Sequence, residues 1–221
     1  MTKIEWTERS WNPIVGCSIV SPGCTNCYAM QMAARIERMS PQLEHYKGLT
    51  KRVNGKAVWT GKLALAPRKT LLEPLRRKRP TMWFVNSMSD LFHEDVPDEW
   101  IDRVFAVMAL CPHHTFQVLT KRSARMRDYM TRVRDVTLGP AMQIIAEARR
   151  LRPDDLYCMT EWPLPHVWLG VSCERQQEAN ERIPDLLATP AAVRFVSAEP
   201  LLGAIDFTSL PSVSGIGRHL D

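Results

Sequence analysis

The apolar residues of this chain follow two alternating patterns. Short continuous apolar runs predict strands buried on both faces, and apolar residues spaced three and four apart predict helices with one buried side. The two patterns alternate along most of the sequence. The predicted strands cover residues 10–16, 82–85, 115–119, 167–171 and 193–196.

Helices are predicted beside these strands. The first spans residues 28–39, with Ala29, Met32 and Ala33 on its apolar side. The others cover 97–108, 123–134, 140–151 and a polar segment that ends at Leu187. Alternating strands and helices imply parallel strands with right-handed crossovers, so we expect one α/β domain over residues 1–221, built as a barrel or partial barrel. A doubly wound sheet is the second architecture that fits this pattern.

One hairpin interrupts the alternation. Asn54-Gly55 lies between two short strand-like runs, Thr50–Val53 and Lys56–Trp59, and this dipeptide is the strongest short-range hairpin signal. We therefore expect a β-hairpin insertion near residues 49–65.

The composition is that of an ordinary globular protein. Of the 221 residues, 45% are hydrophobic and 24% are charged, and the sequence has neither a run of eighteen apolar residues nor a secretory leader at Met1. The sequence thus predicts no membrane partner and a cytoplasmic location. Six cysteines in such a chain indicate reduced thiols or metal ligands, and not a disulfide framework. Three of them stand alone and are expected to be core residues: Cys111, Cys158 and Cys173.

Basic residues exceed acidic ones by 29 to 24, which gives a net charge of +5. They cluster at 68–79 and at 121–134, where a polyanion such as DNA or RNA would be attracted. A solvated helix face explains the same clusters equally well.

Three cysteines near the start of the chain are the most informative chemical feature. Cys24 and Cys27 have the two-residue gap that lets neighbouring thiolates turn onto one metal, and Cys17 lies across a loop that contains Ser21-Pro22-Gly23. A closed structural zinc site takes four protein ligands, whereas three thiolates leave one position open. The motif favours an iron–sulfur cluster with one iron free of protein ligands. The alternatives are plain reduced thiols and a zinc site completed by a distant Cys or by His45.

Polar residues directly follow four of the predicted strands. In parallel α/β barrels the carboxyl ends of the strands form the working face, so we expect these residues and the cysteine loop to meet on one side of the sheet. Ordinary loop polarity and helix N-terminal charge explain any single one of them as well. The groups are Asn86/Ser87/Ser89/Asp90, Thr120/Lys121/Arg122, Ser172/Glu174 and Ser197/Glu199.

The cysteine stretch also carries a resemblance. Trp11-Asn12-Pro13, Gly16-Cys17 and the segment from Ser21 to Ala29 resemble the opening motif of an uncharacterised family of phage and bacterial proteins. That motif is similar to the one in radical S-adenosylmethionine (SAM) enzymes such as spore photoproduct lyase. Six residues separate Cys17 from Cys24, where three are usual in radical SAM enzymes. Later segments resemble the same family: 84–93, 119–122, 169–174 and 196–200.

This resemblance implies a partial (β/α) barrel of the radical SAM type, with a [4Fe-4S] cluster on Cys17, Cys24 and Cys27 and SAM as cofactor. Lys121 and Arg122 would then meet a phosphate or carboxylate of the substrate. Family members usually continue into a further strand and a Gly-Gly-Glu loop, so the barrel is expected to lack its last unit, as a natural short form or an incomplete gene. The residues expected to contact SAM are Tyr28, Asn86, Ser172, Glu174, Ser197 and Glu199.

The expected function is reductive cleavage of SAM to act on a nucleic-acid-related substrate, in a lyase, modification or repair reaction. Flavodoxin or ferredoxin is the expected electron donor. A zinc-stabilised nucleic-acid-binding module and a phage interaction protein without catalysis are the alternatives. The first predicts a colourless zinc protein whose DNA binding weakens steeply with salt, and the second predicts that Cys24→Ala is tolerated.

Overall fold

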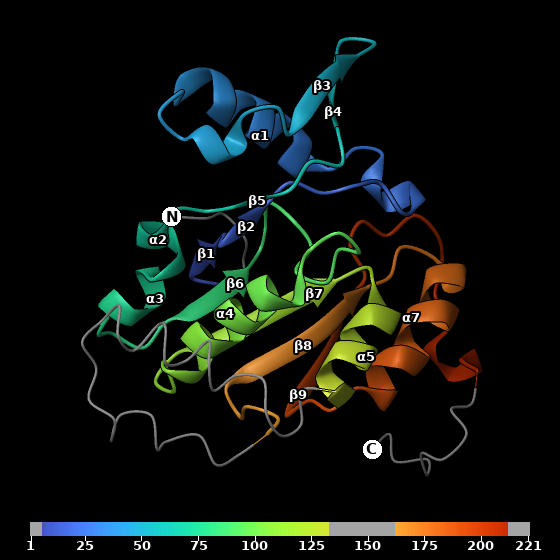
Figure 1. Ribbon diagram of the computed structural model, residues 1–221. Helices are drawn as coiled ribbons and strands as arrows, with labels where there is room; N and C mark the ends of the chain where they lie inside the picture. The colour runs from blue at the N-terminus through green and yellow to red at the C-terminus, as the bar shows by residue number, and fades with distance from the viewer. Residues whose placement is uncertain (1–5, 133–161, 212–221) are drawn as a thin grey trace.

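The computed structural model describes residues 6–132 and 162–211. Its centre is a sheet of five parallel strands that lie side by side in sequence order (Figure 1). This confirms the four strands predicted between residues 82 and 196, and the protein belongs to the α/β class. The described strands follow one another across the sheet in sequence order. In a doubly wound sheet the strand order turns back at a switch point, and the described strands have no such point. In sheet order the strands are β1 (Arg9–Trp11), β6 (Met82–Val85), β7 (Thr115–Thr120), β8 (Val167–Ser172) and β9 (Val193–Ser197).

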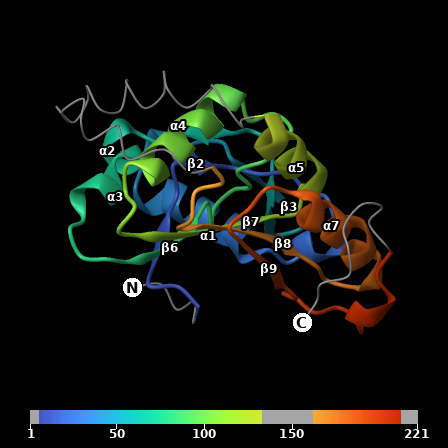
Figure 2. The ribbon, with the colours of Figure 1, turned by 90° about the horizontal axis from the view of Figure 1, so that it is seen from below.

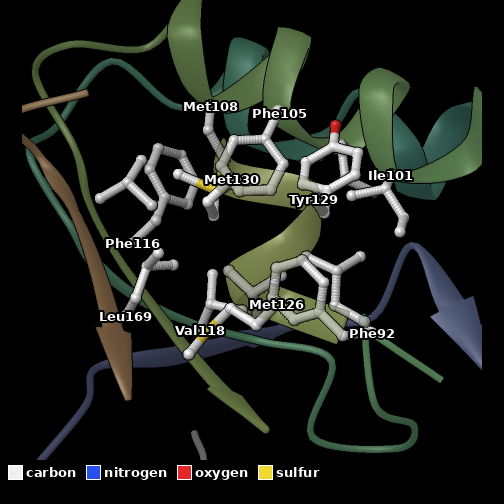
Figure 3. Packing of buried hydrophobic residues seen from close by; sticks show 14 of the residues in the cluster. Phe92, Ile101, Phe105, Met108, Phe116, Val118, Met126, Tyr129, Met130 and Leu169 are labelled. Carbon is white, nitrogen blue, oxygen red and sulfur yellow. The ribbon is translucent and has the colours of Figure 1, made fainter. Parts of the chain in front are cut away.

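Three helices cover one face of the sheet (Figures 1 and 2). They are α4 (Asp98–Ala109), α5 (Ser123–Arg132) and α7 (Gln176–Ala188). Their apolar sides pack against alternate residues of the strands, as period-2 strands and period-3.6 helices require. The resulting core is fully buried (Figure 3), with Phe105 of α4 and Met126 of α5 close to Phe116 and Val118 of β7. Two short helices, α2 (Arg68–Leu71) and α3 (Glu73–Arg76), precede β6.

The opposite face of the sheet carries the other set of alternate residues. Trp6 packs there against Phe84, with ring centroids 4.7 Å apart, and more loosely against Phe195 at 6.4 Å. Gly170 accommodates the Phe195 ring, because a Cβ at residue 170 would lie 2.5 Å from it. An aromatic surface therefore lies beneath the carboxyl ends of the strands.

The predicted first strand, 10–16, is divided in the structure. β1 ends at Trp11, and Pro13 has no N–H to continue a hydrogen-bonded ladder. β2 (Ile14–Val15) then leaves the main sheet and pairs antiparallel with β5 (Ala64–Leu65). Gly16 still forms a bridge with Ser89, so the cysteine loop starts beside the segment that follows β6.

The predicted hairpin is confirmed. β3 (Thr50–Val53) and β4 (Lys56–Trp59) pair antiparallel, and both turn residues have positive φ, 47° at Asn54 and 79° at Gly55. Together with α1 (Tyr28–Met39), the hairpin forms a lobe that projects from the sheet (Figure 1).

Helix α1 has the predicted bounds, but its buried side is rotated from the predicted one. Met30 is buried with Ala29 and Ala33, whereas Met32 is 41% exposed. The reason is that the helix packs on Tyr46 and on Trp59 of the hairpin, which reach the side where Met30 lies.

The remaining described helical segments are single turns of 3₁₀ helix: η1 (Pro22–Cys24), η2 (Glu44–Tyr46) and η4 (Phe207–Ser209). The predicted helix 140–151 and Cys158 lie outside the described residues. Among those that are described, no helix has the length and apolar character to cross a membrane.

Candidate metal and cofactor site

A cavity of about 440 Å³ lies between the cysteine loop and the carboxyl ends of the strands. This volume is in the range usual for small-molecule sites. All three cysteines of the motif line it. So do all the residues predicted to contact SAM or substrate except Glu174, namely Tyr28, Asn86, Lys121, Arg122, Ser172, Ser197 and Glu199. The four strand-end groups and the cysteine loop thus meet around one space, while Glu174 lies behind the loop.

The cysteine loop is folded by its own backbone. The N–H of Cys24 donates to the Ser21 carbonyl (2.9 Å), and the N–H of Cys27 donates to the Cys24 carbonyl (3.2 Å). None of these three cysteines is in a disulfide, and Cys24 is 8% exposed. Burial raises the pKa of Cys17 to about 12 and also raises the pKa of Cys27. A metal that binds these thiols must therefore displace their protons.

A single metal ion and an iron–sulfur cluster make different demands on these thiols. Within residues 6–132 and 162–211, no set of three or more His, Cys, Asp and Glu side chains is close enough to hold one metal ion. His45, the suggested extra zinc ligand, stacks near Tyr46 and does not line the cavity. A [4Fe-4S] cluster makes a different demand, because each thiolate binds a separate iron atom and the sulfurs stand farther apart. The three thiols meet that demand in ligand type, and all of them line one cavity.

Arg122 borders the loop at Cys17. Its Nη1 donates to Cys17 Sγ (3.8 Å) and to Asp90 Oδ2 (3.1 Å), and its Nη2 donates to Ser18 Oγ (2.7 Å). Nε donates to Glu94 (2.5 Å). The side chain is only 8% exposed. The guanidinium is thus occupied by groups of the protein, and its predicted contact with substrate stays a prediction.

Asp90 holds Arg122 in this position. Its carboxylate also accepts hydrogen bonds from Thr120 Oγ1 (2.6 Å), the Lys121 N–H (2.9 Å) and the Phe92 N–H (3.0 Å). Because every acceptor site faces a donor, the carboxylate is fixed rather than available to a ligand. The sequence placed Asp90 in a polar cluster but assigned it no role.

Lys121 points to the other end of the loop, where Glu174 lies. Glu174 is fully buried; its Oε1 accepts from Lys121 Nζ and from Ser21 Oγ (2.8 Å), and its Oε2 accepts from Arg182 Nη1 (2.9 Å). Burial alone would raise the pKa of Glu174, but the hydrogen bonds from Lys121 and Ser21 and the two cations outweigh burial and lower it. In the structure Glu174 therefore contacts the cysteine loop and not the cavity, and its predicted contact with SAM stays untested.

Gly23 makes this contact possible. A Cβ at residue 23 would lie 2.4 Å from Glu174 Cγ, closer than any real contact. The loop can thus rest on the buried carboxylate only because residue 23 has no side chain.

Asn86 lines the cavity and carries a buried donor without a partner. Its backbone has φ +60°, a left-handed conformation that Asn tolerates better than most residues. Its Oδ1 accepts from the Ile14 N–H (3.3 Å), while its Nδ2 is buried and has no hydrogen-bond partner among the described residues. Buried donors are usually paired, so the unpaired Nδ2 makes Asn86 an exception among the residues that line the cavity.

The Ser172 hydroxyl also lines the cavity, but it already has hydrogen-bond partners. Its hydroxyl donates to the Glu199 carbonyl (3.0 Å) and accepts from Lys121 Nζ (2.8 Å). The Glu199 side chain lines the cavity and is exposed, so its carboxylate is available to a ligand.

Several contributors were missed from the sequence. Trp6 and Phe84 give the cavity an aromatic wall, and Arg182 and Ser21 complete the pairing of Glu174. No local pattern marks Trp6 or Arg182, since each acts through contacts distant in sequence. Ser21, Phe84 and Asn12 belong to segments that carried the resemblance. Asn12 Oδ1 accepts from Ser87 Oγ (3.1 Å) and the Met88 N–H (3.0 Å), and so fixes the loop after β6.

The basic cluster predicted at 121–134 is largely neutralised. Arg125 and Arg132 pair with Asp98 (3.1 and 2.9 Å), and Arg127 pairs with Asp185 (2.5 Å). Residues 133 and 134 are not described. This helix face therefore presents less positive charge than its sequence implied.

A protein-family model matches residues 1–216, almost the whole chain. Its description is "Protein of unknown function (DUF5131)", and the chain belongs to this family. Neither a curated protein nor a solved structure matches the chain.

Proposed function

We propose that this DUF5131 protein is an iron–sulfur enzyme of the radical SAM type. Cys17, Cys24 and Cys27 would hold a [4Fe-4S] cluster, and the adjoining cavity would hold SAM. When bound, the cluster supplies the electron for reductive cleavage of SAM. The observation that carries the proposal is that all three thiols and the polar ends of four strands border one cavity. The five parallel strands in sequence order would then form one arc of an open (β/α) barrel.

The chain's own residues would bind and orient the cofactor. Asn86 Nδ2 would donate to a carboxylate or hydroxyl oxygen, which removes an unpaired buried donor. Glu199 would accept from an amino or hydroxyl group. Trp6 and Phe84 offer faces and edges on which a planar base can pack.

The proposed substrate is nucleic-acid-related, and its support is the net charge of +5. Lys121 and Arg122 contribute little to this point, since both are paired with carboxylates of the protein. Their proposed role is to hold the two ends of the cysteine loop.

Anaerobic reconstitution tests the proposal. We expect about four iron and four sulfide per chain, and formation of 5′-deoxyadenosine from SAM when dithionite is added. Cys24→Ala should lose iron and activity. Cys111→Ala, in the helix-covered core, is the matched control and should keep both.

Two results would contradict the proposal. One is a tightly bound tetrahedral zinc in protein purified without oxygen, which would favour the zinc-stabilised alternative. The other is equal iron content in Cys24→Ala and the parent protein, since a lost ligand must weaken a genuine cluster site.

A further inference from the structure

A second hollow lies on the outer side of the cysteine loop. This groove, of about 470 Å³, runs between the loop, α1 and the β3–β4 hairpin. It shares two residues with the cofactor cavity, Asn26 and Cys27. Cys27 therefore separates the two spaces: one side faces the cavity, and the other faces a surface groove.

The groove is mainly apolar, and none of the described residues that line it is aromatic. Its wall includes Ile19, Met30, Val53, Ala57 and Val58. Ile19 is 49% exposed and Val53 is 41% exposed, which is unusual for two large apolar residues around one hollow. Exposed apolar patches with a polar rim are typical of protein contact sites. Single-stranded nucleic acid is usually bound by aromatic stacking, and this groove cannot provide it.

The segment around the groove is positively charged: Lys56 lines the groove, and Lys51 is paired on the hairpin with the lining residue Val58. Residues 17–62 contain seven Lys and Arg against two Glu, an excess equal to that of the whole chain. In the described structure, no carboxylate lies within ion-pair distance of Lys51, Arg52 or Lys56, all exposed on the hairpin. The rest of the chain is balanced in charge, so the lobe is the part that attracts an acidic protein.

We propose that this groove is the docking site of a small acidic one-electron donor protein of the flavodoxin type. The inference rests on the proposed function, because a donor is needed only if a cluster is held by Cys27. The donor is oxidised by one electron and the cluster gains it, and no bond forms or breaks. Docking here brings the donor next to a cluster ligand while the cofactor cavity stays open on the other side. A small, weak interface of this kind is usual for redox partners.

The test compares two double charge reversals. K51E/K56E changes the rim of the groove, and K69E/K78E makes the same change at exposed lysines in and after α2 and α3. Cluster reduction is followed by loss of visible absorbance, with dithionite or with a photoreduced bacterial flavodoxin as reductant. Binding of oxidised flavodoxin is measured separately at low and high salt.

We expect K51E/K56E to slow reduction by flavodoxin and to weaken its binding by about tenfold, and both changes should shrink at high salt. Reduction by dithionite should be unchanged. K69E/K78E should change both rates less than about twofold. Val53→Asp, which alters one exposed apolar side chain and no cation, should also slow flavodoxin specifically.

Other outcomes separate the two proposals. If no variant, including the parent, holds a cluster that dithionite reduces, the proposed function fails and the docking site fails with it. If dithionite reduces the cluster but flavodoxin reduces it at the same rate in all variants, the docking site is overturned and the proposed function stands. The same holds if both double variants slow reduction by flavodoxin equally. Loss of oligonucleotide binding in K51E/K56E at an unchanged flavodoxin rate would also overturn it, in favour of a nucleic-acid surface.

Discussion

Lys121 and Arg122 are consecutive residues after β7, yet they reach opposite ends of the cysteine loop. Arg122 contacts the thiol of Cys17 itself, within a network whose outer member, Glu94, has a 56% exposed side chain. Among the described residues, Lys121 donates no hydrogen bond to a thiol, although its charge opposes the rise in the pKa of Cys27. Its partner Glu174 is fully buried and meets the loop at Ser21 and Gly23.

The sequence predicted one shared role for Lys121 and Arg122, whereas the structure gives them different contacts. The Arg122 network acts on the chemistry of a sulfur, because it places a positive charge beside Cys17. The Glu174 network acts on the position of the loop. Four predictions test this difference, and the first two concern the position of the cysteine loop.

Glu174→Ala should have the largest effect on stability. It leaves the buried Arg182 and the partly buried Lys121 without their shared carboxylate, and breaking a buried ion pair typically reduces the free energy of unfolding by about 3–5 kcal/mol. Urea unfolding measures the change. Glu181→Ala, at an exposed position on the same helix as Arg182, is the control and should change stability by less than about 0.5 kcal/mol. A small effect at Glu174 would mean that its pairing does not hold the loop.

Gly23→Ala should come second. The added methyl meets Glu174 at 2.4 Å, so the loop or the carboxylate must move, at about 1–3 kcal/mol. If the proposed cluster forms, iron retention should fall as well, because Cys24 is the next residue. Gly203→Ala is the control: its new Cβ would lie 3.6 Å from Arg175, an ordinary contact, and nothing should change. Unchanged iron in Gly23→Ala would show that the loop tolerates displacement.

Much of the fold was predictable because local patterns determine it. The strands of the central sheet have continuous apolar runs, and Asn54-Gly55 supplies both positive φ values of its turn. The break at Pro13 and the exposed Met32 were not predicted. Each depends on what the segment packs against, β5 for the first and Tyr46 with Trp59 for the second.

The residues of the site could be predicted from the sequence, but the contacts between their side chains could not. Parallel strands bring their carboxyl ends together, so the polar groups could be expected to meet. Which of them face the cavity depends on side-chain pairing across long sequence separations. Glu174 is the clearest example, since its partners lie 153, 53 and 8 residues away, and no spacing rule relates them.

Arg122→Gln should alter Cys17 with a smaller effect on stability, about 1–2 kcal/mol. Burial and the charge of Asp90 raise the pKa of Cys17, and Arg122 opposes them. Without the cation the pKa rises further, so less thiolate forms and iodoacetamide reacts more slowly, about tenfold per pK unit. Peptide mass spectrometry of the metal-free protein follows the alkylation rate of Cys17 itself.

Two variants sharpen this test. Arg122→Lys keeps the charge and should restore most of the Cys17 rate, whereas a merely structural effect of residue 122 would not be rescued in this way. Lys121→Gln should leave Cys17 unchanged, because Lys121 contacts Glu174 and Ser172 and not this thiol. Equal slowing in both Gln variants would contradict the division between the two networks.

Glu94→Gln should have the smallest effect, and its pH dependence follows from the same geometry. Burial alone would raise the pKa of Glu94, but the hydrogen bond and charge of Arg122 outweigh burial and lower the pKa to about 2. The unfolded chain therefore binds a proton at higher pH than the folded one, and the stability from this pair is lost as pH falls from 4.5 toward 2. Because the side chain is 56% exposed, solvent limits the difference from the parent protein to below about 1 kcal/mol at pH 7. Urea unfolding at pH 7, 4.5 and 3 should show this difference shrinking with pH. A difference as large at pH 3 as at pH 7, or one that exceeds the effect of Glu174→Ala at pH 7, would show that the Arg122 network, and not the Glu174 network, anchors the loop.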